Sequence, residues 1–334
     1  MLLYTLMKDK IKKIYDMIII GGGPIGMFAA YYAGLRTLKV QLIESLGKLG
    51  GQLEALYPEK EMINVPGFAK VKAADFIKLL NQQLNNYPVD IKLNHTVENV
   101  KKLDDVFQIK TNNELFYGKT IMIATGIGPF TPRKLPFDVG QEVENKFISY
   151  YVKNPKKYKD LNVTIAGGGD GAIDIALELL DYAKNITIIH RRDNFRALES
   201  NMVKVYNSPI VLETPYLIKS IDYNSKNSSI TIEKVHESDK KKTIVTDHLI
   251  VSYGFKANNR LQQNWNIELQ RNLVKVDQKM ESTCPGIFAI GDANIYPYKQ
   301  KILANGFGEV PIAINNAINE YSLTANRNIH GVIQ

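Results

Sequence analysis

The chain has 334 residues, of which 45% are hydrophobic and 23% charged, and its formal charge is +8. This length and composition predict a soluble globular protein of two domains, and no apolar run reaches the roughly 20 residues that cross a bilayer. The apolar opening, residues 1–7, is too short for a signal peptide and precedes its basic residues, so we expect a cytoplasmic protein that starts at Met1 or Met7.

The first strong pattern along the chain is a strand, a tight glycine turn and a helix. An apolar run over 16–20 leads into the turn, small residues follow it, and a second apolar run covers 40–43. The turn carries Gly21, Gly23 and Gly26. In a Rossmann βαβ unit these positions make the turn, let the backbone approach a pyrophosphate, and let helix pack on strand. The second run ends in Glu44, whose carboxylate is suited to accept hydrogen bonds from a ribose, so we expect this module to bind FAD.

Three segments that follow alternate between apolar and polar residues, over 96–102, 106–111 and 115–117. Asp- and Asn-containing turns join them, which predicts a small antiparallel sheet. The module closes with an apolar strand over 121–126 that ends in glycine.

The same plan returns in the middle of the chain. A strand over 162–166, a glycine turn, a helix over 173–182 and a strand over 186–189 are predicted. The turn carries Gly167, Gly169 and Ala172. The antiparallel segments and the closing strand are repeated over 229–235, 243–245 and 249–254, with a turn expected at 237–240.

Basic residues follow the second strand of this module, at the place where the first module has Glu44. They are His190, Arg191, Arg192 and Arg196. A guanidinium group pairs bidentately with a phosphate, whereas a carboxylate repels it. We therefore expect this module to bind NADPH in preference to NADH.

Six further motifs indicate a protein family more specifically than the glycine turns do. They are Gly50-Gly51-Gln52-Leu53, Ala55-Leu56-Tyr57-Pro58-Glu59-Lys60, Ala124-Thr125-Gly126, His190-Arg191-Arg192-Asp193, Ile287-Phe288-Ala289-Ile290-Gly291-Asp292 and Gly306-Phe307-Gly308-Glu309. Together they resemble the motifs of the thioredoxin-reductase-like class of ferredoxin–NADP reductase, and the resemblance runs from about Tyr15 to the C-terminus. It implies an α/β fold of two Rossmann-like, three-layer ββα domains. Because a flavin motif returns around Asp292, we expect an NADPH domain, 131–253, inserted into an FAD domain, 1–130 and 254–334.

The resemblance also implies particular residues and partners. The FAD contacts would be Glu44, Gln52, Tyr57, Val97, Gly126, Phe130 and Asp292. Tyr57 would stack on one face of the flavin, and His330 would cover the other face from the second subunit of a homodimer. NADPH would deliver hydride to FAD, and single electrons would pass to ferredoxin or flavodoxin. The cofactors carry this chemistry, so we nominate no catalytic acid–base residue and no metal ligand.

Cysteine usage separates this chain from thioredoxin reductase. Its one cysteine is Cys284, and the segment 148–154, where that enzyme carries a redox Cys-x-x-Cys pair, has none. Electrons must therefore leave from the flavin itself.

The basic residues bear on the partner. Ferredoxins and flavodoxins are acidic, and a cluster of lysines would attract such a protein. The cluster consists of Lys153, Lys156, Lys157 and Lys159. Lysines elsewhere are scattered and not interleaved with aromatic residues, which argues against nucleic acid. Two alternatives stay open, an NADPH oxidase or reductase with a small-molecule acceptor and a non-catalytic flavin redox sensor.

Overall fold

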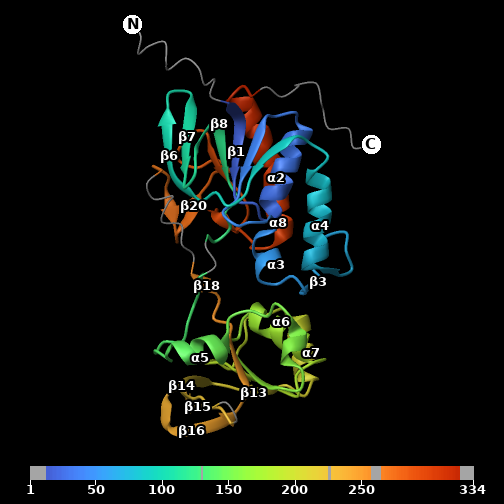
Figure 1. Cartoon of the computed structure of the whole chain (residues 1–334), viewed down its shortest axis with the longest axis vertical. Coiled ribbons are helices and arrows are strands. Elements are labelled where there is room, and N and C mark those ends of the chain that lie inside the picture. The colour runs from blue at the N-terminus through green and yellow to red at the C-terminus, as the bar shows by residue number, and fades with distance from the viewer. Residues whose placement is uncertain (1–12, 129–130, 225–226, 257–264, 324–334) are drawn as a thin grey trace. The chain divides into compact units, whose positions relative to one another are not determined.

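The computed structural model describes residues 13–128, 131–224, 227–256 and 265–323. The chain divides into two compact units, the first made of Met1–Pro129 with Ala257–Gln334 and the second of Phe130–Lys256 (Figure 1). Each unit contains a parallel sheet and a hydrophobic core of its own. The predicted pair of Rossmann-like α/β modules, one inserted into the other, is confirmed. No helix in the described part of the chain has the length and apolar character needed to cross a membrane.

The first unit is built on a seven-stranded sheet with the order β5-β2-β1-β8-β7-β6, in which β21 also pairs with β8. The strands are β1 (Ile14–Ile20), β2 (Val40–Ile43), β5 (Val89–Lys92), β6 (Val97–Leu103), β7 (Val106–Thr111), β8 (Leu115–Ile123) and β21 (Ile287–Ala289). Strands β5, β2, β1, β8 and β21 are mutually parallel, whereas β6 and β7 are antiparallel to their neighbours. The carboxyl ends of the five parallel strands therefore lie at one edge of the sheet.

Strand β8 is longer than the sequence pattern indicated. The segments expected separately at 115–117 and 121–126 form one continuous strand, which ends at Ile123. Its first half pairs with β7 and its second half with β21. The expected separate antiparallel sheet is therefore wrong for this unit, because β6 and β7 extend the parallel sheet instead.

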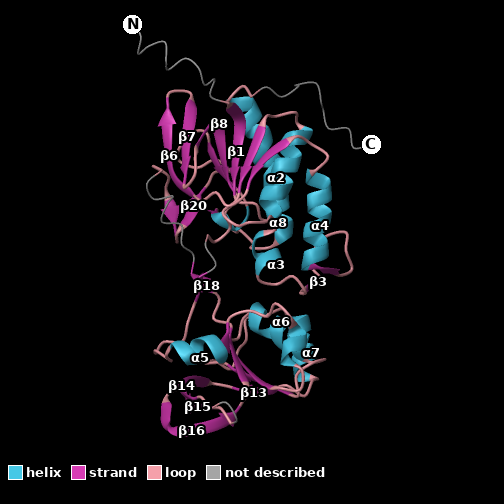
Figure 2. Cartoon of the chain, in the orientation of Figure 1, coloured by secondary structure: helices cyan, strands magenta, loops and turns pink. Residues whose placement is uncertain are grey.

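The described part of the first unit contains the helices α2 (Pro24–Leu35), α3 (Gly51–Ala55), α4 (Ala73–Leu84) and α8 (Leu303–Glu320). Helix α2 packs on β1 and β2 and contacts both α4 and α8 (Figure 2). Because it is covered on several sides, it buries small residues, among them Ala29, Ala30 and Ala33. Helix α4 instead buries one stripe, Phe76, Ile77, Leu80 and Leu84, at the spacing of an amphipathic helix.

Shorter elements complete the first unit. They are the hairpin β3 (Glu61–Met62) and β4 (Val71–Lys72), the small sheet β19 (Leu269–Gln270), β20 (Leu273–Lys275) and β22 (Asn294–Ile295), and the 3₁₀ turn η3 (Gly291–Ala293). The turn η3 connects β21 to β22, so it lies at the carboxyl end of a parallel strand.

The second unit has a five-stranded, all-parallel sheet with the order β10-β17-β11-β12-β13. Its strands are β10 (Ile148–Ser149), β11 (Asn162–Ala166), β12 (Asn185–Ile189), β13 (Val211–Glu213) and β17 (His248–Val251). Its helices are α5 (Gln141–Lys146), η1 (Pro155–Tyr158), α6 (Asp170–Leu179) and α7 (Glu199–Tyr206). A separate antiparallel sheet is formed by β14 (Tyr216–Asp222), β15 (Ser229–Lys234) and β16 (Glu237–Val245).

One expected turn is misplaced. Residues 237–240 do not form a turn but begin strand β16, and Lys234 pairs with Glu237 across a tight connection. The turn consists of Val235 and His236, and His236 adopts a left-handed φ of 68°. Strand β16 is largely exposed and its first half is rich in lysine, so only its end, expected at 243–245, carried a strand signal.

The ends of the second unit are joined by a two-stranded ribbon. Strand β9 (Thr131–Pro132) pairs antiparallel with β18 (Phe255–Lys256), and Arg133 N donates to Gly254 O at 2.9 Å. The chain thus enters and leaves this unit through adjacent strands.

A largely buried histidine lies at the start of β17. His248 Nε2 is 2.8 Å from Ser149 Oγ on β10, and the ring of Tyr158 meets the imidazole edge-on at 5.3 Å between centroids. Burial lowers the pKa of His248 from 6.5 to about 4. The second unit therefore holds this imidazole neutral at physiological pH.

Acid is expected to destabilise the second unit through His248. Because its folded-state pKa lies below 6.5, the unfolded chain binds the extra proton, and the contribution of His248 to stability is lost as the pH falls from 6.5 towards 4. One proton corresponds to at most about 1.4 kcal/mol per pH unit. The fall in Tm between pH 7 and pH 5 should be smaller in His248→Gln than in wild type. His236→Gln, at an exposed turn of the same unit, is the control and should behave like wild type. An equal fall in all three proteins would contradict the prediction.

Candidate cofactor-binding sites

Four sequence motifs of the first unit converge at one edge of its sheet. Strands β1, β2, β8 and β21 are parallel, and each is followed at its carboxyl end by one motif. These are the glycine turn beginning at Gly21, then Glu44, the segment ending in Gly126, and the turn carrying Asp292. In open parallel sheets this edge is where ligands bind.

At two positions of the first turn, the packing of the chain itself leaves room only for glycine. Gly21 has a left-handed φ of 108°, and a Cβ there would overlap the carbonyl oxygen of Ala124. A Cβ on Gly26 would overlap the carbonyl oxygen of Gly21. The first glycine therefore lets β1 turn beside β8, and the third lets α2 pack against that turn.

Gly23 differs from both. A Cβ there would meet no protein atom closer than Gly51 Cα, at 3.9 Å. The residue is the N-cap of α2, whose first turn has no acidic side chain and no side-chain cap. Uncapped N–H groups and the helix dipole favour an anion at this position. Gly23 thus leaves the uncapped start of α2 unobstructed by a side chain, as the pyrophosphate of FAD would require.

Glu44 is buried at the end of β2 and is held by protein donors. Its Oε2 accepts a 2.6 Å hydrogen bond from Gly22 N, and its Oε1 accepts from Leu46 N at 2.7 Å and from Ser45 Oγ at 3.1 Å. A carboxylate offers about four acceptor positions, so one stays open for a ligand hydroxyl. Sequence reasoning predicted the ligand role of Glu44 but missed that it also fastens the glycine turn.

The segments around Gln52 and Val97 are tied to the same edge. Gly50 N donates to Gly22 O at 2.8 Å, which places the start of α3, and Gln52 with it, against the glycine turn. His95 N donates to Glu44 O at 2.9 Å, and the buried Val97 follows as the first residue of β6. Tyr57 comes after α3 and is half-buried, with Lys60 Nζ 6.0 Å from its ring centroid. Phe130 and His330, the other two expected flavin contacts, lie outside the described residues.

The second unit repeats the division of roles among glycines. Gly167 has a φ of 151°, and a Cβ there would overlap the carbonyl oxygen of Ser252. A Cβ on Gly169 would meet only Arg196 O, at 3.8 Å. Ala172 is fully buried in α6, at the position where the first unit has Gly26. The open space again lies at the second glycine, at the start of a helix.

The segment 190–198 folds back onto this turn. Arg196 N donates to Gly168 O at 2.7 Å, and Leu198 N donates to Asp170 Oδ1 at 3.0 Å. The ring of His190 fills the space that a Cβ on Gly168 would need. Burial lowers the pKa of His190, a hydrogen bond to the backbone of Asn194 opposes this shift, and the nearby guanidinium groups add to it, so the neutral form of the ring is favoured. The backbone therefore carries Arg196 to the start of α6.

The three arginines of this segment are exposed: Arg191, Arg192 and Arg196. Within residues 131–224 and 227–256, no carboxylate lies within ion-pair distance of their guanidinium groups. Unpaired guanidinium groups beside this glycine turn suit an additional phosphate on a dinucleotide.

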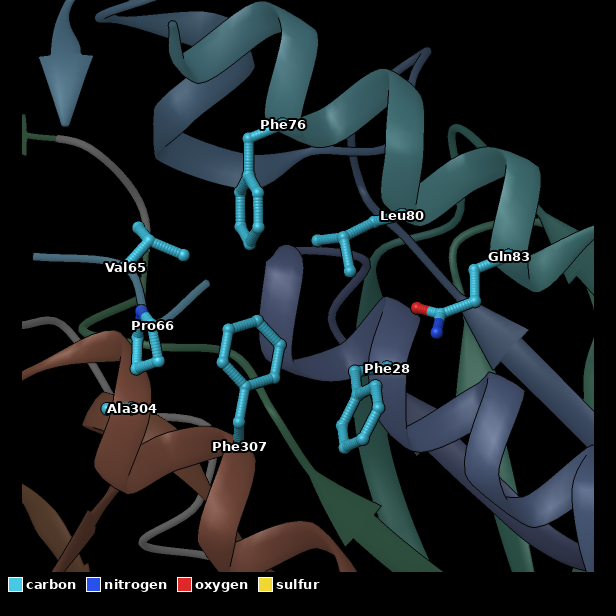
Figure 3. Close-up of a pocket in the computed structure, with 8 residues that line it drawn as sticks. All are labelled: Phe28, Val65, Pro66, Phe76, Leu80, Gln83, Ala304 and Phe307. Atoms are coloured by element: carbon cyan, nitrogen blue, oxygen red, sulfur yellow. The ribbon is translucent and has the colours of Figure 1, made fainter. Parts of the chain in front are cut away.

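A separate apolar hollow lies between α2, α4 and α8. Phe307 meets Phe28 edge-on at 5.2 Å, and Phe76 approaches it at 6.1 Å (Figure 3). The other lining residues are Val65, Pro66, Leu80, Gln83 and Ala304. None of these side chains titrates, so the hollow offers no group for chemistry.

Comparisons with known proteins agree with this geometry. The family model described as pyridine nucleotide-disulphide oxidoreductase matches residues 15–318. A ferredoxin–NADP reductase of Ligilactobacillus salivarius is 44% identical over 311 residues, 91% of either chain. One from Halalkalibacterium halodurans is 44% identical over 308 residues, 92% of this chain and 93% of the relative. The solved thioredoxin reductase of Lactococcus lactis matches with a TM-score of 0.82 at 25% identity, covering 92% of this chain and 99% of that chain. This chain therefore belongs to the pyridine nucleotide-disulphide oxidoreductases and, among them, to the ferredoxin–NADP reductases of the thioredoxin-reductase-like class.

Proposed function

We propose that the chain is an NADPH-dependent flavoprotein reductase that takes electrons from NADPH onto FAD and passes them singly to ferredoxin or flavodoxin. The observation that carries the proposal is the repeated glycine turn. In both units a side chain at the first glycine would overlap a backbone carbonyl oxygen, whereas a side chain at the second glycine, at the start of a helix, would overlap no protein atom. A carboxylate stands beside one turn and three arginines beside the other.

The FAD domain in this proposal is the first unit. The cofactor contacts that it contributes are Gly21, Gly23, Gly26, Glu44, Gln52, Tyr57, Val97, Gly126, Asp292 and His330, and Phe130, the first residue of the second unit, adds another. When bound, FAD supplies hydride acceptance and single-electron release. The glycine turn and α2 hold the pyrophosphate, Glu44 accepts from the ribose, and Asp292 accepts from the ribityl chain. Tyr57 shields one face of the flavin ring.

The NADPH domain is the second unit. Its contacts are Gly167, Gly169, Ala172, His190, Arg191, Arg192 and Arg196. The glycine turn and α6 hold the pyrophosphate, and the arginines pair with the 2′-phosphate. His190 positions the segment by packing under Gly168.

An acidic electron acceptor is supported by exposed lysines around η1. Lys153, Lys156, Lys157 and Lys159 are exposed, and Lys153 Nζ lies 5.3 Å from the ring centroid of Tyr151. Charges at such a surface raise the association rate more than the affinity, and salt screens them.

A cytoplasmic homodimer is also part of the proposal. The apolar hollow supports a subunit contact, because the elements that line it also expose Leu79 on α4 and Ile312 on α8. Sedimentation velocity at micromolar concentration would detect the dimer, and a monomer would remove this part of the proposal.

Anaerobic stopped-flow absorbance tests the main proposal. Purified protein should carry FAD, NADPH should bleach its absorbance faster than NADH, and ferredoxin or flavodoxin should restore it. Reoxidation should slow as the ionic strength rises, whereas thioredoxin should have no effect. Bleaching that only oxygen or a quinone reverses would overturn the acceptor, and no bleaching by NADPH would overturn the reductase.

A further inference from the structure

A buried pair of opposite charges lies beside the turn that carries Asp292. The Lys299 side chain is 5% exposed and that of Glu309, on α8, is 3% exposed, and the two form an ion pair. Buried charges are unfavourable unless they are paired and hydrogen-bonded. No role for Lys299 follows from the sequence pattern.

Every acceptor position of Glu309 is used. Oε1 accepts from Lys299 Nζ and from Tyr296 Oη, the latter at 2.9 Å. Oε2 accepts from Gly291 N at 2.7 Å and from Asn294 Nδ2 at 3.1 Å. Four donors therefore converge on one carboxylate, which is as many as it accommodates.

The same pair fixes both backbone groups of Gly291. Glu309 accepts from its N–H, and Lys299 Nζ donates to its carbonyl oxygen at 3.1 Å. Gly291 has a left-handed φ of 65°. Asn294 extends the network by donating to Ala289 O, at the end of β21, at 2.8 Å. The network thus forms hydrogen bonds to the chain on both sides of Asp292, at Gly291 and Asn294.

Asp292 is the exposed member of this turn. Gly291, Ala293 and Asn294 are buried, whereas the Asp292 side chain points to solvent. The turn is also packed against the starts of two helices. A Cβ on Gly291 would be 3.4 Å from Ile25 of α2, and one on Gly306 of α8 would be 3.4 Å from Gly291 Cα. A shift of the turn would therefore move Asp292 relative to the glycine turn.

We propose that Lys299 and Glu309 are positioning residues for FAD, which hold the Gly291–Asn294 turn so that Asp292 meets the ribityl chain. This inference rests on the proposed FAD site at the same sheet edge. A buried ion pair is weak support for stability, since apolar replacements of such pairs are often neutral. Here both charged groups form hydrogen bonds directly to the backbone of Gly291, so the pair fixes the position of the turn.

The test compares FAD with ADP on full-length protein freed of its flavin. ADP contains the ribose and pyrophosphate that reach Glu44 and Gly23, but it lacks the ribityl chain that reaches Asp292. FAD binding is followed by flavin fluorescence, and ADP affinity for the same site is taken from its competition with FAD. In Lys299→Met the Kd for FAD should rise about 10- to 100-fold, while the competition constant of ADP stays within about twofold. The absorbance maxima of the bound flavin should also shift.

Matched variants separate positioning from stability. Lys279→Met breaks an exposed ion pair with Glu320, the last residue of α8, and should leave both affinities unchanged. Tyr296→Phe removes one donor to Glu309 without leaving a charge unpaired, and it should raise the Kd for FAD about threefold to tenfold. This variant carries the test if Lys299→Met fails to fold. Equal weakening of FAD and ADP, or no change in either, would overturn the inference. Wild-type protein that binds no FAD would overturn the proposed function itself.

Discussion

Gly23→Ala protein is expected to fold normally and to lose tight FAD binding. The added Cβ would meet no protein atom closer than 3.9 Å, so the fold has no reason to change. It would instead occupy the space assigned to the pyrophosphate. An overpacked contact costs about 1–3 kcal/mol, so the Kd for FAD should rise roughly 10- to 100-fold. The flavin content of the purified protein gives a first measure of FAD binding, and titration of the flavin-free protein with FAD gives the Kd.

Two further alanine variants act as controls. Gly169→Ala makes the same change in the second unit, where the nearest atom is Arg196 O at 3.8 Å. It should weaken NADPH binding and leave the FAD content intact. Gly26→Ala should instead lower the Tm, because its Cβ would overlap Gly21 O. A Gly23→Ala protein with a normal FAD content would rule out the pyrophosphate position.

Replacement of Arg191 or Arg196 by alanine is expected to erase the preference for NADPH over NADH. A hydrogen bond to a charged group contributes about 1.5–3 kcal/mol, so kcat/KM for NADPH should fall about 10- to 100-fold. NADH has no 2′-phosphate, and its kcat/KM should stay within about twofold. Lys204→Ala removes an exposed positive charge from α7 of the same unit and should change neither value. Equal losses with both nucleotides would mean that the arginines shape the segment without reading the phosphate.

The parts that were predictable from sequence are short-range. Each glycine turn, its flanking strands and the residue that ends the second strand lie within about thirty residues, and their spacing reflects one βαβ unit. The edge where they meet follows from parallel pairing, so the grouping of Gly21, Glu44 and Asp292 was foreseeable once the motifs were placed.

The parts that were missed depend on tertiary contacts or on exposure. Lys299 looks like an ordinary surface residue in sequence, and Glu309 appears there only as the last residue of a family motif. Only the packing of α8 against the Gly291 turn buries the two together. Strand β16 was misjudged because an exposed strand tolerates lysines that resemble a turn or loop. The continuous β8 was divided because Gly118 and Lys119 interrupt its apolar pattern.

The pairing of β9 with β18 has a consequence for how such proteins diversify. Because the two ends of the inserted unit are adjacent strands, its removal or exchange requires no rethreading of the sheet in the first unit. The second unit can therefore be exchanged as a whole, and the entropic cost of bringing its two ends together grows only slowly with the length of the insert. If the proposed assignment of the two cofactors holds, recombination at these two strands would exchange the NADPH-binding unit in a single event and leave the sequence of the first unit unchanged.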